Sequence, residues 1–265
     1  MSVYEPPATD LEELIAFFDY DATQPLGVSV VARERREGVD VMELRYDDGA
    51  GGPVEAYVVG RAAAAGVVVA HGGAGPGKHI FLPEAIELAQ RGFVCLLADT
   101  SFPSDGTTAE RVEATRVRVL TQRRGLDVLA TEYGATRLGF YGHSAGGMQG
   151  AVLSAVEPRL AAIVVAAARG GSVRWALEER VTDQEVLDAF HRLDPEHYVA
   201  VLGRRHLLFQ HGRRDAVVRL AEGRLLHDAA AEPKQWIEYD CDHGVDAHPP
   251  ARVDRIAFLE EVLLS

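Results

Sequence analysis

Three runs rich in apolar residues follow one another between residues 28 and 59, separated by short polar connections that contain glycine. These runs predict three strands, and the short connections at Glu37-Gly38 and Asp47-Asp48-Gly49 predict that they pair in antiparallel fashion. Ahead of them, Thr9-Asp10-Leu11-Glu12 has the form of a capping box and predicts a helix of about ten residues. The expected strands cover residues 28–35, 39–46 and 54–59.

From Gly66 onward the pattern changes to short apolar runs that alternate with longer helical segments. Most of the runs are apolar along their whole length, as expected for strands covered by helices on both faces. The alternation predicts an α/β fold with a mainly parallel sheet and an antiparallel N-terminal edge. The expected strands are 66–70, 93–98, 138–141, 160–166, 206–210 and 234–239, and the expected helices are 81–90, 108–133, 145–155, 219–231 and 249–264.

The segment from about residue 169 to 205 breaks this alternation, because it is too long for a simple crossover between two strands. It contains a capping-box pattern, Thr182-Asp183-Gln184-Glu185, so we expect a small helical lid inserted into a single domain that spans residues 1–265. Three aromatic residues of this segment, Trp175, Phe190 and Tyr198, are candidates for an apolar substrate pocket, and the alternative is that they pack the lid onto the body of the protein. Phe102, which follows the predicted strand 93–98, is a fourth candidate for the pocket.

Composition narrows the class of protein. The chain of 265 residues has a formal net charge of −13, which argues against a general nucleic-acid surface. Its longest apolar runs have nine residues, far short of a membrane span, and the N-terminus does not have the form of a signal peptide. Two cysteines and no closed set of Cys or His ligands predict a reduced, cytoplasmic setting without a metal site. The sequence leaves the oligomeric state open.

The motif that carries most chemical information is Gly142-His143-Ser144-Ala145-Gly146-Gly147. A strand-like run precedes it and a helical run of small residues follows, which is the context in which G-x-S-x-G marks a nucleophilic serine. Side chains two residues before and after the serine would collide in so sharp a turn, and glycine removes that collision. Ser144 is therefore the candidate nucleophile.

A serine hydroxyl needs an adjacent base, and that base needs a carboxylate to orient it. Asp215 follows the predicted strand 206–210, and His243 follows the predicted strand 234–239. The carboxyl ends of parallel strands lie at one edge of a sheet, so Ser144, Asp215 and His243 can converge there as a catalytic triad.

Attack on a carbonyl also needs backbone amides that stabilise the negative oxygen. One expected donor is the amide of Ala145, and the other comes from the glycine-rich loop His71-Gly72-Gly73-Ala74-Gly75. Gly73 is the preferred second donor and Ala74 the alternative. His71 is expected to brace this loop rather than to take part in the reaction.

These motifs together resemble the α/β-hydrolase superfamily, and within it the dienelactone-hydrolase-like and prolyl-oligopeptidase-like serine esterases. The carrying segments are residues 67–73, 142–147, 207–215 and 242–244. The resemblance implies a sheet of about eight strands and a Ser–His–Asp triad. Ester hydrolysis through an acyl-enzyme requires no cofactor, and none is expected here. Dienelactone hydrolases typically carry a cysteine nucleophile, so serine here favours hydrolysis of a carboxylic ester. The expected substrate is an ester of a small, partly apolar molecule, and a thioester or lactone stays open as an alternative.

Three other functions stay open on the sequence alone. The scaffold could support acyl transfer or cyclisation in a biosynthetic pathway, or a non-catalytic relative that binds a small ligand. Gly72 to Lys78 also matches the phosphate-binding pattern G-x-x-x-x-G-K. Against that third function, His79 stands where a magnesium-binding Ser or Thr belongs, and Pro76 lacks an N–H for phosphate.

Overall fold

The computed structural model describes residues 4–73, 77–100, 105–201, 203 and 205–265. Its strands form one mixed sheet, which confirms the predicted α/β class. The sheet has nine strands, the number given by the apolar pattern and one more than the family resemblance implies. The strands are β1 (Ser29–Arg36), β2 (Val39–Asp47), β3 (Pro53–Val59), β4 (Ala65–Ala70), β5 (Phe93–Ala98), β6 (Arg137–His143), β7 (Leu160–Ala166), β8 (His206–Gly212) and β9 (Lys234–Tyr239).

The strand order is β1-β2-β3-β5-β4-β6-β7-β8-β9. The first three strands pair in antiparallel fashion, and β3 runs antiparallel to β5. From β5 to β9 every pairing is parallel, so the carboxyl ends of β4, β6, β8 and β9 lie along one edge. β1 forms an outer edge of the sheet, and all eight of its residues are exposed.

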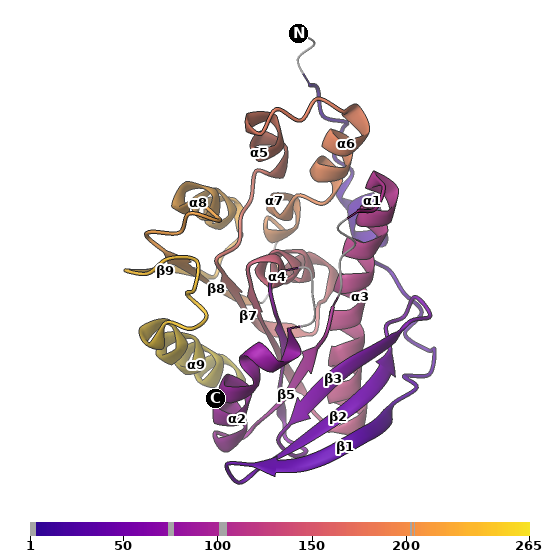
Figure 1. Cartoon of the computed structure of the whole chain (residues 1–265), viewed down its shortest axis with the longest axis vertical. Coiled ribbons are helices and arrows are strands. Elements are labelled where there is room, and N and C mark those ends of the chain that lie inside the picture. The colour runs from indigo at the N-terminus through magenta and orange to yellow at the C-terminus, as the bar shows by residue number, and fades with distance from the viewer. Residues whose placement is uncertain (1–3, 74–76, 101–104, 202, 204) are drawn as a thin grey trace.

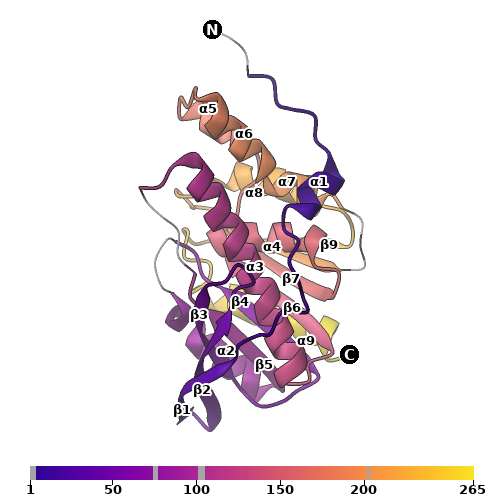
Figure 2. The same ribbon diagram turned by 90° about the vertical axis from the view of Figure 1, so that its right-hand side faces the viewer.

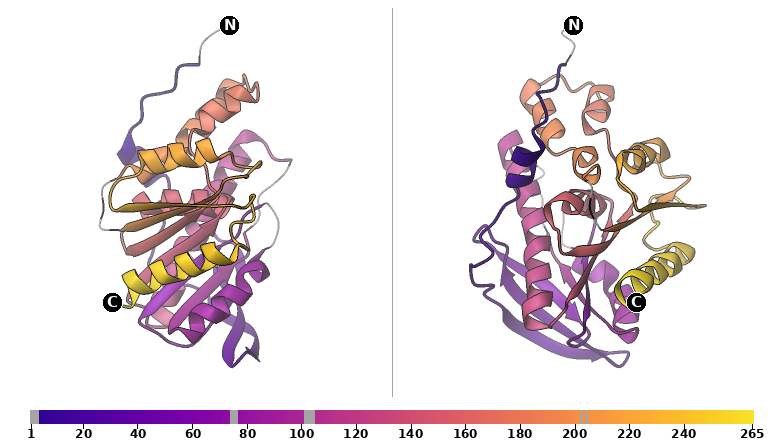
Figure 3. Two further views of the ribbon diagram at one scale, coloured as in Figure 1. Left: turned by 90° about the vertical axis from the view of Figure 1, so that its left-hand side faces the viewer. Right: turned by 180° about the vertical axis from the view of Figure 1, so that it is seen from behind.

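Helices cover both faces of the parallel part of the sheet (Figures 1 and 3). On one face lie α3, α4 and α8, and on the other lie α2 and α9. Each face therefore has its own apolar core, and successive residues of a strand contribute to opposite cores, as Val67 and Val68 do. The helices are α1 (Leu11–Ala16), the 3-10 helix η1 (Lys78–Phe81), α2 (Leu82–Gln90), α3 (Thr108–Glu132), α4 (Ala145–Val156), α5 (Ser172–Glu178), α6 (Gln184–Arg192), α7 (Pro195–Val199), α8 (Leu220–Ala229) and α9 (Pro249–Leu263).

Three short helices, α5, α6 and α7, lie between β7 and β8, and we call them the helical insertion. α7 packs on α4 and α8, whereas α6 contacts α5 and α3. In Figure 2, α5 and α6 lie at the end of the molecule opposite to β1 and β2. Within the described part of the chain, no helix is long and apolar enough to cross a membrane.

The N-terminal helix is shorter than the sequence predicts. α1 has six residues, and its N-cap is Asp10, whose Oδ1 accepts from the N–H groups of Glu12 and Glu13. Its C-terminal end meets α3, where Arg116 donates to Phe17 O and Arg123 donates to Phe18 O. These side chains bond to backbone carbonyls that a further helical turn would use, so the helix ends there.

A buried ion pair joins the two helices on one face of the sheet. Arg255 on α9 donates to both carboxylate oxygens of Glu84 on α2, at 2.6 and 2.5 Å, and the two side chains are 0% and 5% exposed. One turn away, Arg252 and Glu87 form a second pair at 2.7 Å with side chains 32% and 34% exposed. The same two helices thus carry a buried pair and a surface pair.

We expect Arg255→Met to lower the free energy of unfolding by about 3–5 kcal/mol, because it leaves the Glu84 carboxylate buried without its partner. Arg252→Met is the matched control and should cost less than about 1 kcal/mol, since solvent reaches and screens this partly exposed pair. Urea unfolding followed by circular dichroism measures both. Equal losses in the two variants would contradict the expectation.

Candidate active site

Ser144 stands at a sharp turn between the end of β6 and the start of α4. Its φ of 55° and ψ of −118° are values that residues other than glycine rarely adopt. Hydrogen bonds hold the turn on both sides, because Ser144 N–H donates to Ala166 O at 2.8 Å and Ser144 O accepts from Met148 N–H at 3.0 Å. Backbone strain held in this way is typical of functional positions.

Two glycines make the turn possible. A Cβ atom on Gly142 would lie 2.1 Å from Gly146 O, and one on Gly146 would lie 2.3 Å from Ala70 O. Neither distance leaves room for a side chain, and in both cases the obstacle is backbone. The turn is therefore packed directly against the end of β4.

Asp215 and His243, which are separated along the chain, meet at the same sheet edge. His243 Nδ1 donates to Asp215 Oδ2 at 2.8 Å, and Asp215 Oδ1 accepts from Val217 N–H and Val218 N–H, each at 2.8 Å. The Asp215 side chain is fully buried, whereas that of His243 is 23% exposed. Because a carboxylate only accepts hydrogen bonds, this contact places a proton on His243 Nδ1, and in the neutral ring Nε2 is the nitrogen that can accept a proton.

His143, the residue before Ser144, links the serine turn to the loop that carries His243. Its Nε2 donates to His243 O at 2.8 Å, and the two rings lie 4.9 Å apart. The same Nε2 is 3.4 Å from Asp246 Oδ1. Burial lowers the pKa of His143, so the ring is neutral at pH 7 and its one proton is used in this contact.

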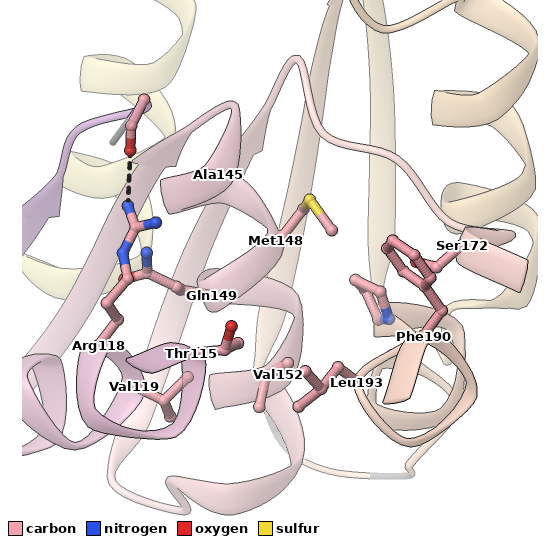
Figure 4. Close-up of a pocket in the computed structure, with 12 residues that line it drawn as sticks. Thr115, Arg118, Val119, Ala145, Met148, Gln149, Val152, Ser172, Phe190 and Leu193 are labelled. Carbon is pink, nitrogen blue, oxygen red and sulfur yellow. Dashed lines mark hydrogen bonds between the residues drawn. The ribbon is translucent and has the colours of Figure 1, made fainter. Parts of the chain in front are cut away.

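The glycine-rich loop after β4 lies against the serine. A Cβ atom on Gly72 would be 2.8 Å from Ser144 Cβ, and Gly73 has a φ of 78° that favours glycine. Gly73 O accepts from the Arg118 guanidinium of α3 at 3.1 Å (Figure 4). Burial lowers the pKa of Arg118 to about 10, so it remains charged at neutral pH.

His71 braces the same loop. Its Nδ1 donates to Gly72 O at 2.8 Å, and its Nε2 accepts from Thr100 N–H at 3.2 Å. The ring is 1% exposed, and burial lowers its pKa. His71 therefore holds the loop as a neutral side chain. Ala74, the alternative amide donor, lies outside the described residues.

The lysine of the phosphate-binding pattern, Lys78, forms ion pairs with carboxylates. Lys78 is 7% exposed, and its Nζ lies 3.1 Å from Glu43, 3.5 Å from Glu55 and 3.2 Å from Asp99. Asp99 Oδ1 also accepts from the N–H groups of Gly77 and Lys78, each at 2.8 Å. Two amides of the pattern and the ammonium of its lysine are thus bonded within the protein.

A cavity of about 400 Å³ opens beside Gly73 and Ala145 and extends between α3, α4 and the helical insertion (Figure 4). A second cavity of about 670 Å³ shares part of its wall. Phe190 lines both cavities and Trp175 lines the second, and their rings meet edge to face at 5.7 Å.

The expectation for Tyr198 is corrected by its burial. Its side chain is 0% exposed, packs against Phe18 at 5.7 Å and donates to Arg192 O at 2.9 Å. Tyr198 therefore belongs to the core beneath the helical insertion and lines neither cavity. Phe102, the fourth aromatic candidate, lies outside the described residues.

Three neighbours of the predicted site residues escape sequence reasoning. Gly72 makes room for Ser144, His143 binds the backbone of His243, and Arg118 binds the backbone of Gly73. His143 stands inside the serine motif and could have been singled out there. Arg118 is one arginine of many on a long helix, and nothing in its surroundings in the sequence distinguishes it.

Residues 67–221 match the family model described as the alpha/beta hydrolase fold. This match agrees with the strained serine after a central strand, with the Asp–His pair at the same sheet edge and with the order of the strands. The chain belongs to the α/β-hydrolase family. The match covers more than half of the chain, and the predicted superfamily is thereby confirmed. Among curated proteins, none matches this sequence.

Solved structures of other hydrolases share the fold at low identity. Acetyl xylan esterase 1 from a Thermoanaerobacterium strain is 15% identical with a TM-score of 0.79, and the alignment covers 97% of this chain and 95% of that one. A cold-adapted esterase from an Arctic intertidal metagenomic library is 16% identical, with a TM-score of 0.66 and coverages of 89% and 99%. A puromycin-hydrolyzing peptidase from Mycobacterium tuberculosis is 19% identical, with a TM-score of 0.67 and coverages of 83% and 39%.

No group of three or more potential ligands among the described His, Cys, Asp and Glu residues could hold a metal ion. The histidines around the site instead have structural partners. His211, for example, donates from Nε2 to Val218 O at 2.9 Å and stacks on Trp236.

Burial of His71 predicts a loss of stability in acid. The pKa of this ring is lower in the folded protein than the value of about 6.5 in the unfolded chain, so below that pH the unfolded chain binds a proton that the folded protein does not. The contribution of His71 to the free energy of unfolding is fully present above about pH 6.5. It falls as the pH drops, by up to about 1.4 kcal/mol per pH unit.

His71→Gln keeps an acceptor for Thr100 N–H but cannot titrate. Urea unfolding at pH 7.5, 6.5 and 5.5 should therefore show a shallower loss of stability in the variant than in the wild type. A variant that loses stability as steeply as the wild type would show that His71 is not the titrating group.

Proposed function

We propose that this protein is a serine hydrolase that cleaves the carboxylic ester, thioester or lactone of a small, partly apolar molecule. The observation that carries the proposal is the hydrogen bond of 2.8 Å between His243 Nδ1 and Asp215 Oδ2, at the sheet edge where Ser144 occupies its strained turn. Ser144 is the proposed nucleophile, His243 the base and Asp215 the orienting acid.

The proposed reaction has two steps, each with His243 as the proton carrier. His243 Nε2 accepts the proton of Ser144 Oγ as this oxygen attacks the carbonyl carbon, and then donates it to the leaving alcohol. In the second step a water molecule gives its proton to His243 and attacks the acyl-enzyme, which releases the acid and restores Ser144. Asp215 stabilises the positive charge on the ring in both steps.

The negative oxygen of each intermediate is proposed to bind the amides of Ala145 and Gly73. The Ala145 amide is the first of α4, where the helix dipole also favours negative charge. The contact of Arg118 with Gly73 O and that of His71 with Gly72 O fix the loop that presents the second amide. Removal of one such donor costs about 3–4 kcal/mol of transition-state stabilisation in serine hydrolases.

The similar structures guide the substrate class only in part. Two of them are described as esterases and one as a peptidase, which supports a hydrolase and favours an ester without naming it. We propose that the substrate is a small molecule and that the protein binds neither nucleic acid nor a membrane. Acyl transfer to an alcohol uses the same acyl-enzyme, and product analysis with and without added alcohol separates it from hydrolysis.

Ser144→Ala should lower kcat/KM for a p-nitrophenyl ester by about four to six powers of ten, because members of a triad act as one unit. It should also abolish labelling by a fluorophosphonate. Ser29→Ala, on the exposed strand β1, is the control and should retain both. Wild-type protein that takes no label and releases no nitrophenol would favour a ligand-binding protein instead.

Asp215→Asn gives a sharper test of the assigned proton positions. The two backbone N–H groups that donate to Asp215 Oδ1 would hold the side-chain oxygen of the new asparagine in the same place. Its NH2 group would then face His243 Nδ1. Nδ1 would then have to accept, Nε2 would carry the proton, and the base would be lost, so kcat should fall about 10⁴-fold with little change in melting temperature. Activity within tenfold of the wild type would exclude Asp215 as the orienting acid.

A further inference from the structure

The cavity beside Gly73 and Ala145 is a groove that follows α4 away from the proposed reaction centre. Residues at i, i+3, i+4 and i+7 of a helix share one face, and the residues of α4 that line the cavity have this spacing. They are Ala145, Met148, Gln149 and Val152. The groove therefore begins at the residue after Ser144 and ends near Val152.

The opposite walls come from α3 and the helical insertion. Val119 lines the groove from α3, and Phe190 and Leu193 line it from α6 and the residue after it. In Figure 4 the Met148 side chain extends from α4 toward Phe190, while Val152 and Leu193 face each other at the far end. The residues that line the groove are thus mostly apolar.

Three of the four polar side chains that line the groove have partners within the protein, and the fourth is Ser172. Thr115 Oγ1 donates to Arg111 O at 2.9 Å, Arg118 donates to Gly73 O, and the Gln149 amide lies 3.2 Å from that of Gln122. Their contribution to the groove is therefore largely structural, and a ligand meets mainly hydrocarbon. A groove of this kind suits an aliphatic chain.

The position of His243 decides which part of an ester the groove accepts. The proposed mechanism requires His243 to protonate the leaving oxygen, so the alcohol part must lie on the side of His243. The described residues of the groove come from the loop after β4, from α3 and α4 and from the helical insertion, and none from the segments that carry Asp215 and His243. The acyl part of the ester must therefore point into the groove.

We propose that this groove binds an aliphatic acyl chain of about eight carbons, and that Val152 and Phe190 set its length. This proposal rests on the proposed function. Seven residue steps from Ala145 to Val152 span about 10 Å at 1.5 Å per residue. An extended chain advances about 1.2 Å per bond, so about eight bonds fill that distance.

Phe190 lies between the groove and the second cavity. Three residues line both cavities and form the partition between them: Thr115, Phe190 and Leu193. Truncation of Phe190 should join the two spaces and admit longer chains. A large side chain at Val152 should instead shorten the groove.

The test is kcat/KM for p-nitrophenyl esters from acetyl to dodecanoyl, compared with acetate esters of alcohols of increasing length. In the wild type we expect about a threefold rise per methylene up to about octanoyl, followed by a fall, and no such rise in the alcohol series. The expected ratio of octanoyl to acetyl kcat/KM is thus several hundred.

Two variants and one control locate the effect. Val152→Phe should lower the octanoyl-to-acetyl ratio at least tenfold, and Phe190→Ala should raise the dodecanoyl-to-octanoyl ratio at least tenfold. Leu177→Ala, an exposed residue of α5 that lines neither cavity, should leave both ratios and the acetyl rate unchanged. Should Val152→Phe not fold, Phe190→Ala still tests the partition.

Different results overturn different proposals. Wild-type protein that hydrolyses none of these esters overturns the proposed function and the acyl groove together. Protein that hydrolyses them with a rate that ignores acyl length, or that follows alcohol length, overturns the acyl groove alone. Length profiles of Phe190→Ala and wild type that coincide do the same.

Discussion

Close packing of backbone around Ser144 is the constraint on which the rest of the structure depends. The turn fits only because glycines at 142 and 146 leave space for each other and for the end of β4. A Cβ atom on Gly147 would likewise lie 2.9 Å from Ala166 O at the end of β7. Three neighbouring strands thus end against one turn, and the strained backbone of Ser144 persists because it has no room to relax.

From this turn the site extends outward through backbone contacts made by side chains. His143 reaches the carbonyl of His243, and Arg118 reaches the carbonyl of Gly73. On the far side, Arg255 donates to Val245 O and Asp246 O as well as to Glu84, so the loop after β9 is tied to both α2 and α9. A buried ion pair in the helical layer therefore also anchors the loop of the proposed base.

The sequence predicts those parts of the site that depend on local order. The serine motif is contiguous, and Asp215 and His243 each follow a strand whose apolar run is clear, so parallel topology alone brings them to one edge. Contacts such as Arg118 with Gly73 depend on how α3 lies on the sheet, which no short pattern encodes. Local ambiguity also limits prediction: Thr9-Asp10 and Thr182-Asp183 each offer two caps, and the structure uses the aspartate in both.

The exposed edge strand β1 has a consequence for how this protein behaves at high concentration. An unpaired strand edge is a template on which another chain can add a strand and start an aggregate. Here four charged residues in a row, from Arg33 to Arg36, would have to lose their water if a second sheet docked. The register shift between Val30 and Ala32 further distorts the edge at its more apolar end. The strand can thus complete the sheet without offering a flat surface for self-association.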